Sequence, residues 1–228
     1  MLVANTLHDL GVCVREAGRL EEAEELLRRC LGIREATLGP EDVQVAYTLH
    51  DLGVCVRQAG RLEEAEELLR CCRGIAEAKL GPEHERVACT LLSLGCCLQK
   101  AGRLDEAEEL LRRCLSTREA KLSPKDVLVA DSLHHLAVLY RETSRLGEAE
   151  VVFRRCLAIQ EAVSSVGQLN VPVAESLREL DLCVRGVGKL VEVAGCVVDA
   201  TSSCRGTLMM AVRVFSCAFI VYWAFVWH

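Results

Sequence analysis

The feature that most constrains this chain is an internal repeat with a period of 42 residues. Residues 2–43 and 44–85 align without a gap and are identical at 33 of 42 positions. The period continues through residues 86–127 and 128–163, so four units are clear. A fifth, degenerate unit begins near residue 173 after a two-residue insertion. A chain of this kind folds as an array in which each unit packs against its neighbours.

Each unit contains the pattern of two amphipathic helices. In the first unit the apolar spacing i, i+3, i+4, i+7 predicts one helix over residues 3–17, with an inner face formed by Leu7, Leu10, Gly11 and Val14. Gly18 suits the end of that helix, and a second helix follows. Pro40 ends the second helix, and with the acids Glu41 and Asp42 it suits the first turn of the next unit. Each unit is therefore helix–turn–helix–loop.

Composition agrees with an all-α chain and excludes several functions. Only four prolines interrupt a sequence rich in helix formers, and no run of alternating strand residues occurs. The net charge of −6 argues against nucleic acid as a partner, because phosphate binding needs a basic face. Residues 1–30 lack a secretion signal, so the 14 cysteines are expected to be reduced in the cytoplasm and mostly buried.

The helix pairs should stack into a right-handed α-solenoid, because each pair has more apolar surface than it can cover alone. The glycines at positions 11, 53 and 95 recur in phase with the alanines at 23, 65 and 107. We expect these small residues to lie where the two helices of a unit approach most closely.

The pattern Leu7-x2-Leu10-Gly11-x2-Val14-x3-Gly18, continued by Ala23-x3-Leu27-x2-Cys30, resembles the tetratricopeptide repeat. The 42-residue spacing and the Leu-Gly-Pro connection resemble kinesin light chain-like repeats. This resemblance covers residues 2–163 well and residues 173–199 weakly. It implies a non-enzymatic scaffold whose first helices line a concave face that binds peptides or partner proteins.

No pattern in the sequence supports catalysis, a metal or a cofactor. Seven cysteines recur at the repeat period, which is typical of packing, and the adjacent pairs Cys71-Cys72 and Cys96-Cys97 lack the spacing of zinc ligands. No phosphate-binding glycine loop or catalytic triad pattern occurs on a suitable scaffold. We therefore predict that the chain is not an enzyme and holds neither a metal nor a cofactor.

Two ladders of polar residues fall on the solvent side of the first helices and are the candidate peptide-binding residues. The basic ladder is Arg15, Arg57, Lys100, Arg141 and Arg185. The second ladder is His8 and Asp9, His50 and Asp51, Leu92 and Ser93, and His134 and His135. Guanidinium groups bind carboxylates well, so one interpretation is an acidic peptide partner; a simply solvated face is the other. Glu16, Glu142 and Glu179 lie beside the basic ladder and would neutralise it within the chain.

The chain is divided into four clear units over residues 1–163, a degenerate unit over 164–199, and a different segment over 200–228. Six of the nine aromatic residues lie in the last fourteen positions, and Leu208–Trp227 contains a single charge, Arg213. Three interpretations of this segment remain open: a membrane tail anchor, a cap on the solenoid, or a non-native end.

The sequence thus predicts a cytoplasmic protein–protein interaction scaffold that binds a partner peptide on the concave face of the array. One alternative is an adaptor fragment of a transport or signalling assembly, including one tethered to a membrane by its tail. Another is a non-functional fragment of a duplicating repeat family, suggested by the near-identity of the first two units.

Overall fold

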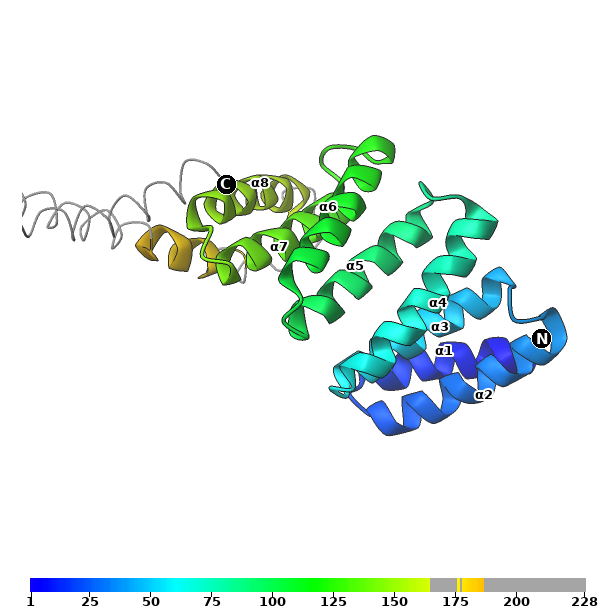
Figure 1. Ribbon diagram of the computed structural model, residues 1–228. Helices are drawn as coiled ribbons and strands as arrows, with labels where there is room; N and C mark the ends of the chain where they lie inside the picture. The colour runs from blue at the N-terminus through cyan, green and yellow to red at the C-terminus, as the bar shows by residue number, and fades with distance from the viewer. Residues whose placement is uncertain (165–175, 177, 187–228) are drawn as a thin grey trace, which may run out of the picture. The chain divides into compact units, whose positions relative to one another are not determined.

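The computed structural model describes residues 1–164, 176 and 178–186, and in these ranges it contains helices and loops but no strand (Figure 1). The chain divides into two compact units, Met1–Asp181 and Leu182–His228. Only residues 182–186 of the second unit are described. The prediction of an all-α fold is confirmed.

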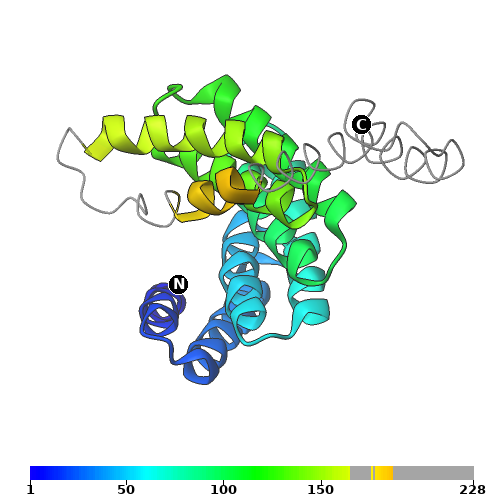
Figure 2. The same ribbon diagram turned by 90° about the vertical axis from the view of Figure 1, so that its left-hand side faces the viewer.

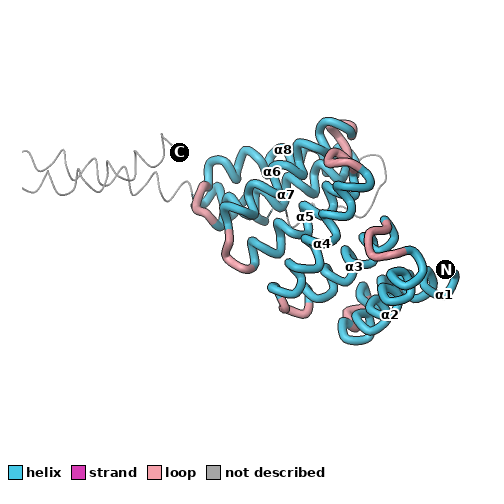
Figure 3. The backbone as a smooth tube through the Cα atoms, turned by 45° about the vertical axis from the view of Figure 1, so that its right-hand side comes forward, coloured by secondary structure: helices cyan, strands magenta, loops and turns pink. Residues whose placement is uncertain are grey.

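The helices of the first unit follow one another as antiparallel pairs joined by short loops (Figure 3). Each pair contains one odd-numbered and one even-numbered helix, and each even-numbered helix also contacts the odd-numbered helix that follows it. The bounds are α1 Leu2–Glu16, α2 Leu20–Leu38, α3 Val43–Gln58, α4 Leu62–Leu80, α5 Glu85–Lys100, α6 Leu104–Lys121, α7 Val127–Glu142 and α8 Leu146–Ser164. This succession matches the predicted helix pairs, including the 42-residue period.

The turn inside each pair requires one residue with positive φ. Gly60, between α3 and α4, has a φ of +85°, which costs glycine little because it has no Cβ. In the fourth pair Ser144 takes this position with a φ of +61°. The turn therefore persists where the sequence has lost its glycine.

Helix α3 begins three residues after Pro40, later than the sequence suggested. The prediction that Pro40 starts the first turn is wrong, because α3 begins at Val43 and Asp42 is its N-cap. The Asp42 side chain accepts a hydrogen bond of 2.8 Å from the backbone N–H of Gln44. A carboxylate at the N-cap satisfies a free backbone donor, and Pro40 is left in the connecting loop.

The recurrent glycines lie at the closest approach of the two helices in a pair, as predicted. A Cβ built on Gly53 would lie 2.9 Å from Leu69 Cγ and 3.5 Å from the backbone oxygen of Ala65. Gly11 and Gly95 show the same arrangement in their pairs. In the fourth pair the buried Ala137 stands in this register.

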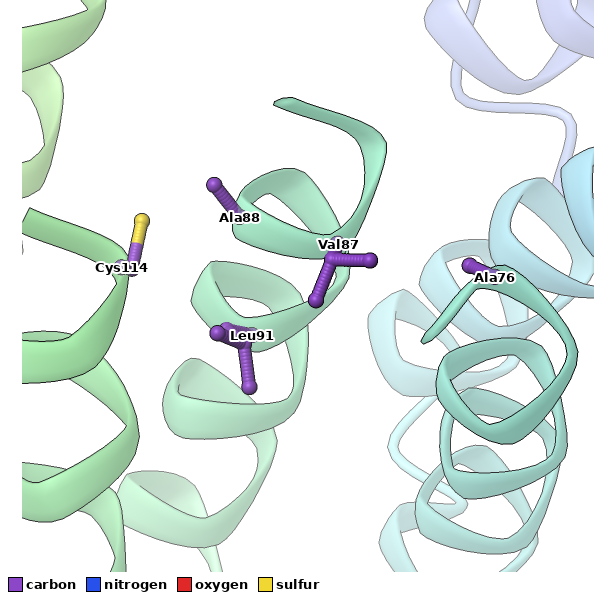
Figure 4. Packing of buried hydrophobic residues seen from close by; sticks show 5 residues of the cluster. All are labelled: Ala76, Val87, Ala88, Leu91 and Cys114. Carbon is purple, nitrogen blue, oxygen red and sulfur yellow. The ribbon is translucent and has the colours of Figure 1, made fainter. Parts of the chain in front are cut away.

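Between pairs, small apolar residues and thiols fill the core. Figure 4 shows Val87 on α5 pointing toward Ala76 on α4, with Ala88 and Leu91 on the side of α5 that faces Cys114 on α6. Thiols also contact hydroxyl groups of the following helix in register: Cys72 Sγ lies 3.4 Å from Thr90 Oγ1. The expectation of mostly buried cysteines holds among the described residues, although Cys13 and Cys71 are exposed.

The N-terminal pair differs from the others at the outer side of α1 (Figure 2). Leu10, predicted to belong to the inner face, is 47% exposed, whereas its counterpart Leu52 on α3 is 1% exposed. The reason is that α2 covers this face of α3, while no described helix covers the same face of α1.

The C-terminal predictions lie mostly outside the described residues. Ser176 and residues 178–186 are helical where the degenerate fifth unit is expected. The segment over residues 200–228 is not described. Within the described ranges, no helix has the length and apolar character needed to cross a bilayer.

Candidate functional site

The helices of the first unit meet their neighbours in two different ways. Successive odd-numbered helices, α1 to α3, α3 to α5 and α5 to α7, contact each other directly. We call the polar side of these four helices the A-helix face. On the even-numbered helices and the turns before them, long side chains connect neighbouring pairs; we call this the B-helix side. Its ion pairs are Arg61–Glu24, Arg103–Glu66 and Arg145–Glu108, with N–O distances of 2.6, 2.7 and 2.8 Å.

The histidine ladder of the A-helix face joins successive units. His8 Nε2 lies 2.9 Å from Asp51 Oδ2, and His50 Nε2 lies 3.0 Å from Ser93 Oγ. At the C-terminal end of the ladder, His134 Nδ1 lies 3.1 Å from Ser176 Oγ. These side chains are therefore used within the array, and Asp9 is exposed beside them.

The contact between His8 and Asp51 favours the charged forms of both side chains. The hydrogen bond to Asp51 raises the pKa of His8 against the opposing effect of burial. Burial alone would raise the pKa of Asp51, but hydrogen bonds from His50 and His8 outweigh it, so the pKa of Asp51 is lowered. Each charge thus stabilises the other across the junction of α1 and α3.

The side chains of Cys96 on α5 and of His135 and Asp131 on α7 lie next to one another. Cys96 Sγ lies 3.3 Å from His135 Nδ1, and His135 Nε2 lies 3.7 Å from Asp131 Oδ1. Burial raises the pKa of the Cys96 thiol to about 11 and lowers the pKa of His135. A nucleophilic cysteine needs the opposite shift, so this cluster has the geometry of a catalytic relay without an activated thiol.

Some residues of the basic ladder are paired within the chain, and others are available to a ligand. Arg15, Arg57 and Arg141 share one register position in the last turns of α1, α3 and α7, and Gln99 fills it in α5. Lys100 is exposed one residue further on. Arg141 is neutralised, as predicted for Glu179: its Nε lies 2.7 Å from Glu179 Oε2.

The two N-terminal arginines of the ladder lack such a partner. The Nε atoms of Arg15 and Arg57 are buried and form no hydrogen bond within the described part of the chain. Among the described residues, the only carboxylate at ion-pair distance from Arg15 is Glu16, at 4.0 Å. No carboxylate of the described residues pairs with Arg57. Gln99 donates a hydrogen bond of 2.7 Å to Glu142, so this acid does not reach the ladder arginines.

Arg185, the last member of the predicted ladder, belongs to the second unit. The site described above consists of residues of the first unit alone. The described residues contain no group of three or more histidine, cysteine or acidic side chains arranged to hold a metal ion.

Sequence reasoning missed two buried arginines that connect the units. Arg118 is 1% exposed and donates hydrogen bonds of 2.8 and 2.9 Å to Leu128 O and Ser132 Oγ. Arg34 makes the same contacts with Gln44 O and Thr48 Oγ1. The signal was available, since arginine recurs at this position two units apart with a hydroxyl residue fourteen positions later.

The comparisons with known proteins agree with this architecture. A family model described as tetratricopeptide repeat matches residues 2–78, 48–120 and 86–162. No curated protein matches the chain.

Solved structures resemble the chain in fold. The crystal structure of BtubC (BKLC) from P. vanneervenii is 21% identical, has a TM-score of 0.72, and is aligned over 89% of this chain and 81% of that one. Two structures of nearly identical TPR-like repeats from a kinesin light chain candidate of Podosopora anserina are each 24% identical with TM-scores of 0.68. They cover 87% and 89% of this chain, and 92% and 97% of theirs. The resemblance to kinesin light chain-like repeats is confirmed at the level of fold.

The repeat period, the stacked helix pairs and the family match over residues 2–162 agree, and the chain belongs to the tetratricopeptide repeat family.

Proposed function

We propose that the chain is a protein-interaction scaffold that holds an acidic peptide segment of a partner along the A-helix face. The family match supports a protein-binding scaffold. The observation that favours an acidic peptide is the pair of buried, unpartnered Nε atoms of Arg15 and Arg57. A buried polar atom without an acceptor is costly, and the partly exposed guanidinium groups of these two arginines can bind a ligand carboxylate.

The mechanism is binding without turnover. Arg15 and Arg57 receive carboxylates, and Lys100 adds positive charge at the edge of the face. The histidines at positions 8, 50 and 134 have a structural task, since they connect successive units and fix the relative positions of the odd-numbered helices. A rigid, preorganised face loses less entropy when it binds a flexible peptide. The cytoplasm is the location that we propose for this activity.

The experiment measures binding of the full chain to immobilised peptides of acidic, neutral and basic composition at low and high salt. We expect selective capture of acidic peptides that weakens at high salt, because exposed charges are screened. Arg15→Gln and Arg57→Gln should each reduce capture. Arg154→Gln is the matched control, because Arg154 on α8 is exposed and pairs with Glu150. Capture that is independent of peptide charge, or no capture, would contradict the proposal and favour an adaptor that contacts folded domains.

A further inference from the structure

The register of the A-helix face distinguishes the ladder arginines from one another. One ladder arginine contacts a carboxylate of the helical segment that follows it: Arg141 Nε lies 2.7 Å from Glu179 Oε2. We use this contact to define a register position on the other helices. Allowing for the two-residue insertion before the fifth unit, the positions equivalent to Glu179 are Ser93 opposite Arg57 and Asp51 opposite Arg15.

The fourth pair shows what this register position does when it carries a carboxylate. Glu179 is 8% exposed and places Oε2 2.7 Å from the Nε of Arg141. The contact has the distance of an ion pair but not the alignment of a hydrogen bond. Glu179 thus occupies, within the chain, the place that a ligand carboxylate would take on an arginine of this ladder.

The second pair lacks this internal carboxylate. Ser93 stands in the Glu179 position, and its hydroxyl group is hydrogen-bonded to His50. Arg15 differs, because its register partner Asp51 already brings a negative charge, which His8 and His50 share. Among the ladder arginines of the first unit, Arg57 alone is opposite a neutral, uncharged side chain.

The surroundings of Arg57 are also suited to an anion. The charges of Arg57 and Lys100 both act to lower the pKa of Cys96, which burial nevertheless raises. Arg57 likewise acts to lower the pKa of His135. The acid beside these two neighbours, Asp131, is shared by His135 and Arg118.

We propose that Arg57 is the anchoring residue for an aspartate or glutamate side chain of the bound peptide, in the place that Glu179 takes on Arg141. In the fourth repeat, Glu179 pairs with the ladder arginine Arg141, so this arginine is not available to a ligand. This inference rests on the proposed function. It adds that Arg57 binds the ligand carboxylate, whereas Arg141 is already paired within the chain.

The test adds a carboxylate at one of the two register positions and removes the carboxylate from the other. Ser93→Glu places an internal carboxylate opposite Arg57, and the control Ser93→Gln also removes the hydroxyl contact to His50 but adds no charge. Glu179→Gln removes the internal carboxylate from Arg141. Binding is measured with fluorescent peptides that carry one internal glutamate and an amidated C-terminus, and with glutamine peptides that have a free C-terminal carboxylate.

For the glutamate peptide we expect at least about a tenfold loss of affinity in Arg57→Gln and in Ser93→Glu, the effect of one charge-assisted contact. Ser93→Gln should stay close to the original chain, and Glu179→Gln should bind more tightly because a second arginine becomes available. Preferential binding of the free C-terminal carboxylate would overturn the assignment to a side chain.

A separate readout keeps this inference distinct from the proposed function. In Ser93→Glu, but not in Ser93→Gln, the Nε–H nuclear magnetic resonance signal of Arg57 should shift as the new carboxylate pairs with it. An unchanged signal would overturn the register. If acidic peptides bind but neither Arg57→Gln nor Ser93→Glu changes their affinity, the scaffold function stands and the anchor is refuted. Absence of acidic peptide binding refutes both.

Discussion

At the residue scale, a glycine that recurs with the period was enough to predict a close contact between helices. The sequence shows glycine at positions 11, 53 and 95, and the structure places each against a leucine of the partner helix. The prediction succeeded because these glycines lie on the apolar face of the first helix of each pair. Recurrence alone is not sufficient, since Gly32 and Gly74 also recur inside helices and a Cβ on either meets nothing within 4 Å. Conformational freedom is not the reason, since positive φ occurs in the loops and turns instead.

Gly53→Leu should destabilise the array by about 1–3 kcal/mol, because a side chain would be forced into a filled core. Even a Cβ would meet Leu69 Cγ at 2.9 Å, and Leu69 is fully buried and unable to move aside. The free energy of unfolding is measured by urea denaturation. Gly74→Ala is the control, since a Cβ on Gly74 meets nothing within 4 Å, and this change should stabilise α4 slightly. Equal stability of Gly53→Leu and the original chain would refute the packing.

The buried arginines show where residue-level reasoning fails. Arginine on a helix normally keeps its head group in water while its stem packs, so the residue type alone does not indicate that Arg34 and Arg118 are buried. Their burial depends on acceptors from the next helix pair, namely a backbone carbonyl and a hydroxyl group. In the second repeat, Ala76 stands at the position equivalent to Arg34 and Arg118. The repeat pattern therefore does not place an arginine at this position consistently.

At the scale of elements, the sequence placed the histidines on the correct helices but did not show the contacts that they make between repeats. They were predicted to face a ligand, and His8, His50 and His134 instead connect one odd-numbered helix to a later segment. Periodicity gives the face of a helix, but it does not give the spacing between helices. The spacing decides whether two side chains on that face bind each other or a partner.

The contact between α1 and α3 predicts a pH-dependent stability. The raised pKa of His8 gives stability that is complete below about pH 6.5 and is lost as pH rises through the folded-state pKa. The lowered pKa of Asp51 gives stability that is present above about pH 4 and is lost as pH falls. The contact is therefore strongest between these values.

Thermal unfolding of the original chain and of His8→Gln, measured from pH 4 to 9, should show the largest difference in Tm near pH 5–6 and a smaller one at pH 8–9. The other five histidines are common to both proteins and cancel in the comparison. A difference that grows with rising pH would contradict the assigned pair.

At the scale of the whole first unit, the fold could be predicted because the thiol–hydroxyl contact repeats at successive junctions between helix pairs. The thiol of Cys30 meets the hydroxyl of Thr48 as Cys72 meets Thr90, eighteen residues apart in both cases. Local helix signals and the 42-residue period are consistent with each other. The degenerate fifth unit and the tail break this consistency, and there the sequence left several interpretations open.

Removal of one complete unit should therefore leave a folded protein. In a chain lacking residues 44–85, the position of Thr90 relative to Cys30 becomes that of Thr48, and Asp42 remains the N-cap of the following helix. We expect cooperative unfolding at a lower Tm with unchanged helical ellipticity per residue, because stability in arrays sums over units and junctions.

Deletion of residues 50–90 is the matched control, since its junction lies inside a helix and rotates the later part of that helix by one residue, so cooperative unfolding should be lost. Similar behaviour of the two deletions would show that the junction contacts do not determine the stacking.

The two sides of the array differ in how their contacts would respond to salt. Short, directional hydrogen bonds connect neighbouring odd-numbered helices, whereas flexible arginine–glutamate pairs connect the B-helix side. Salt screens exposed ion pairs. We therefore expect rising ionic strength to weaken the arginine–glutamate pairs of the B-helix side more than the part-buried imidazole contacts of the A-helix face, so the two sides would loosen unequally.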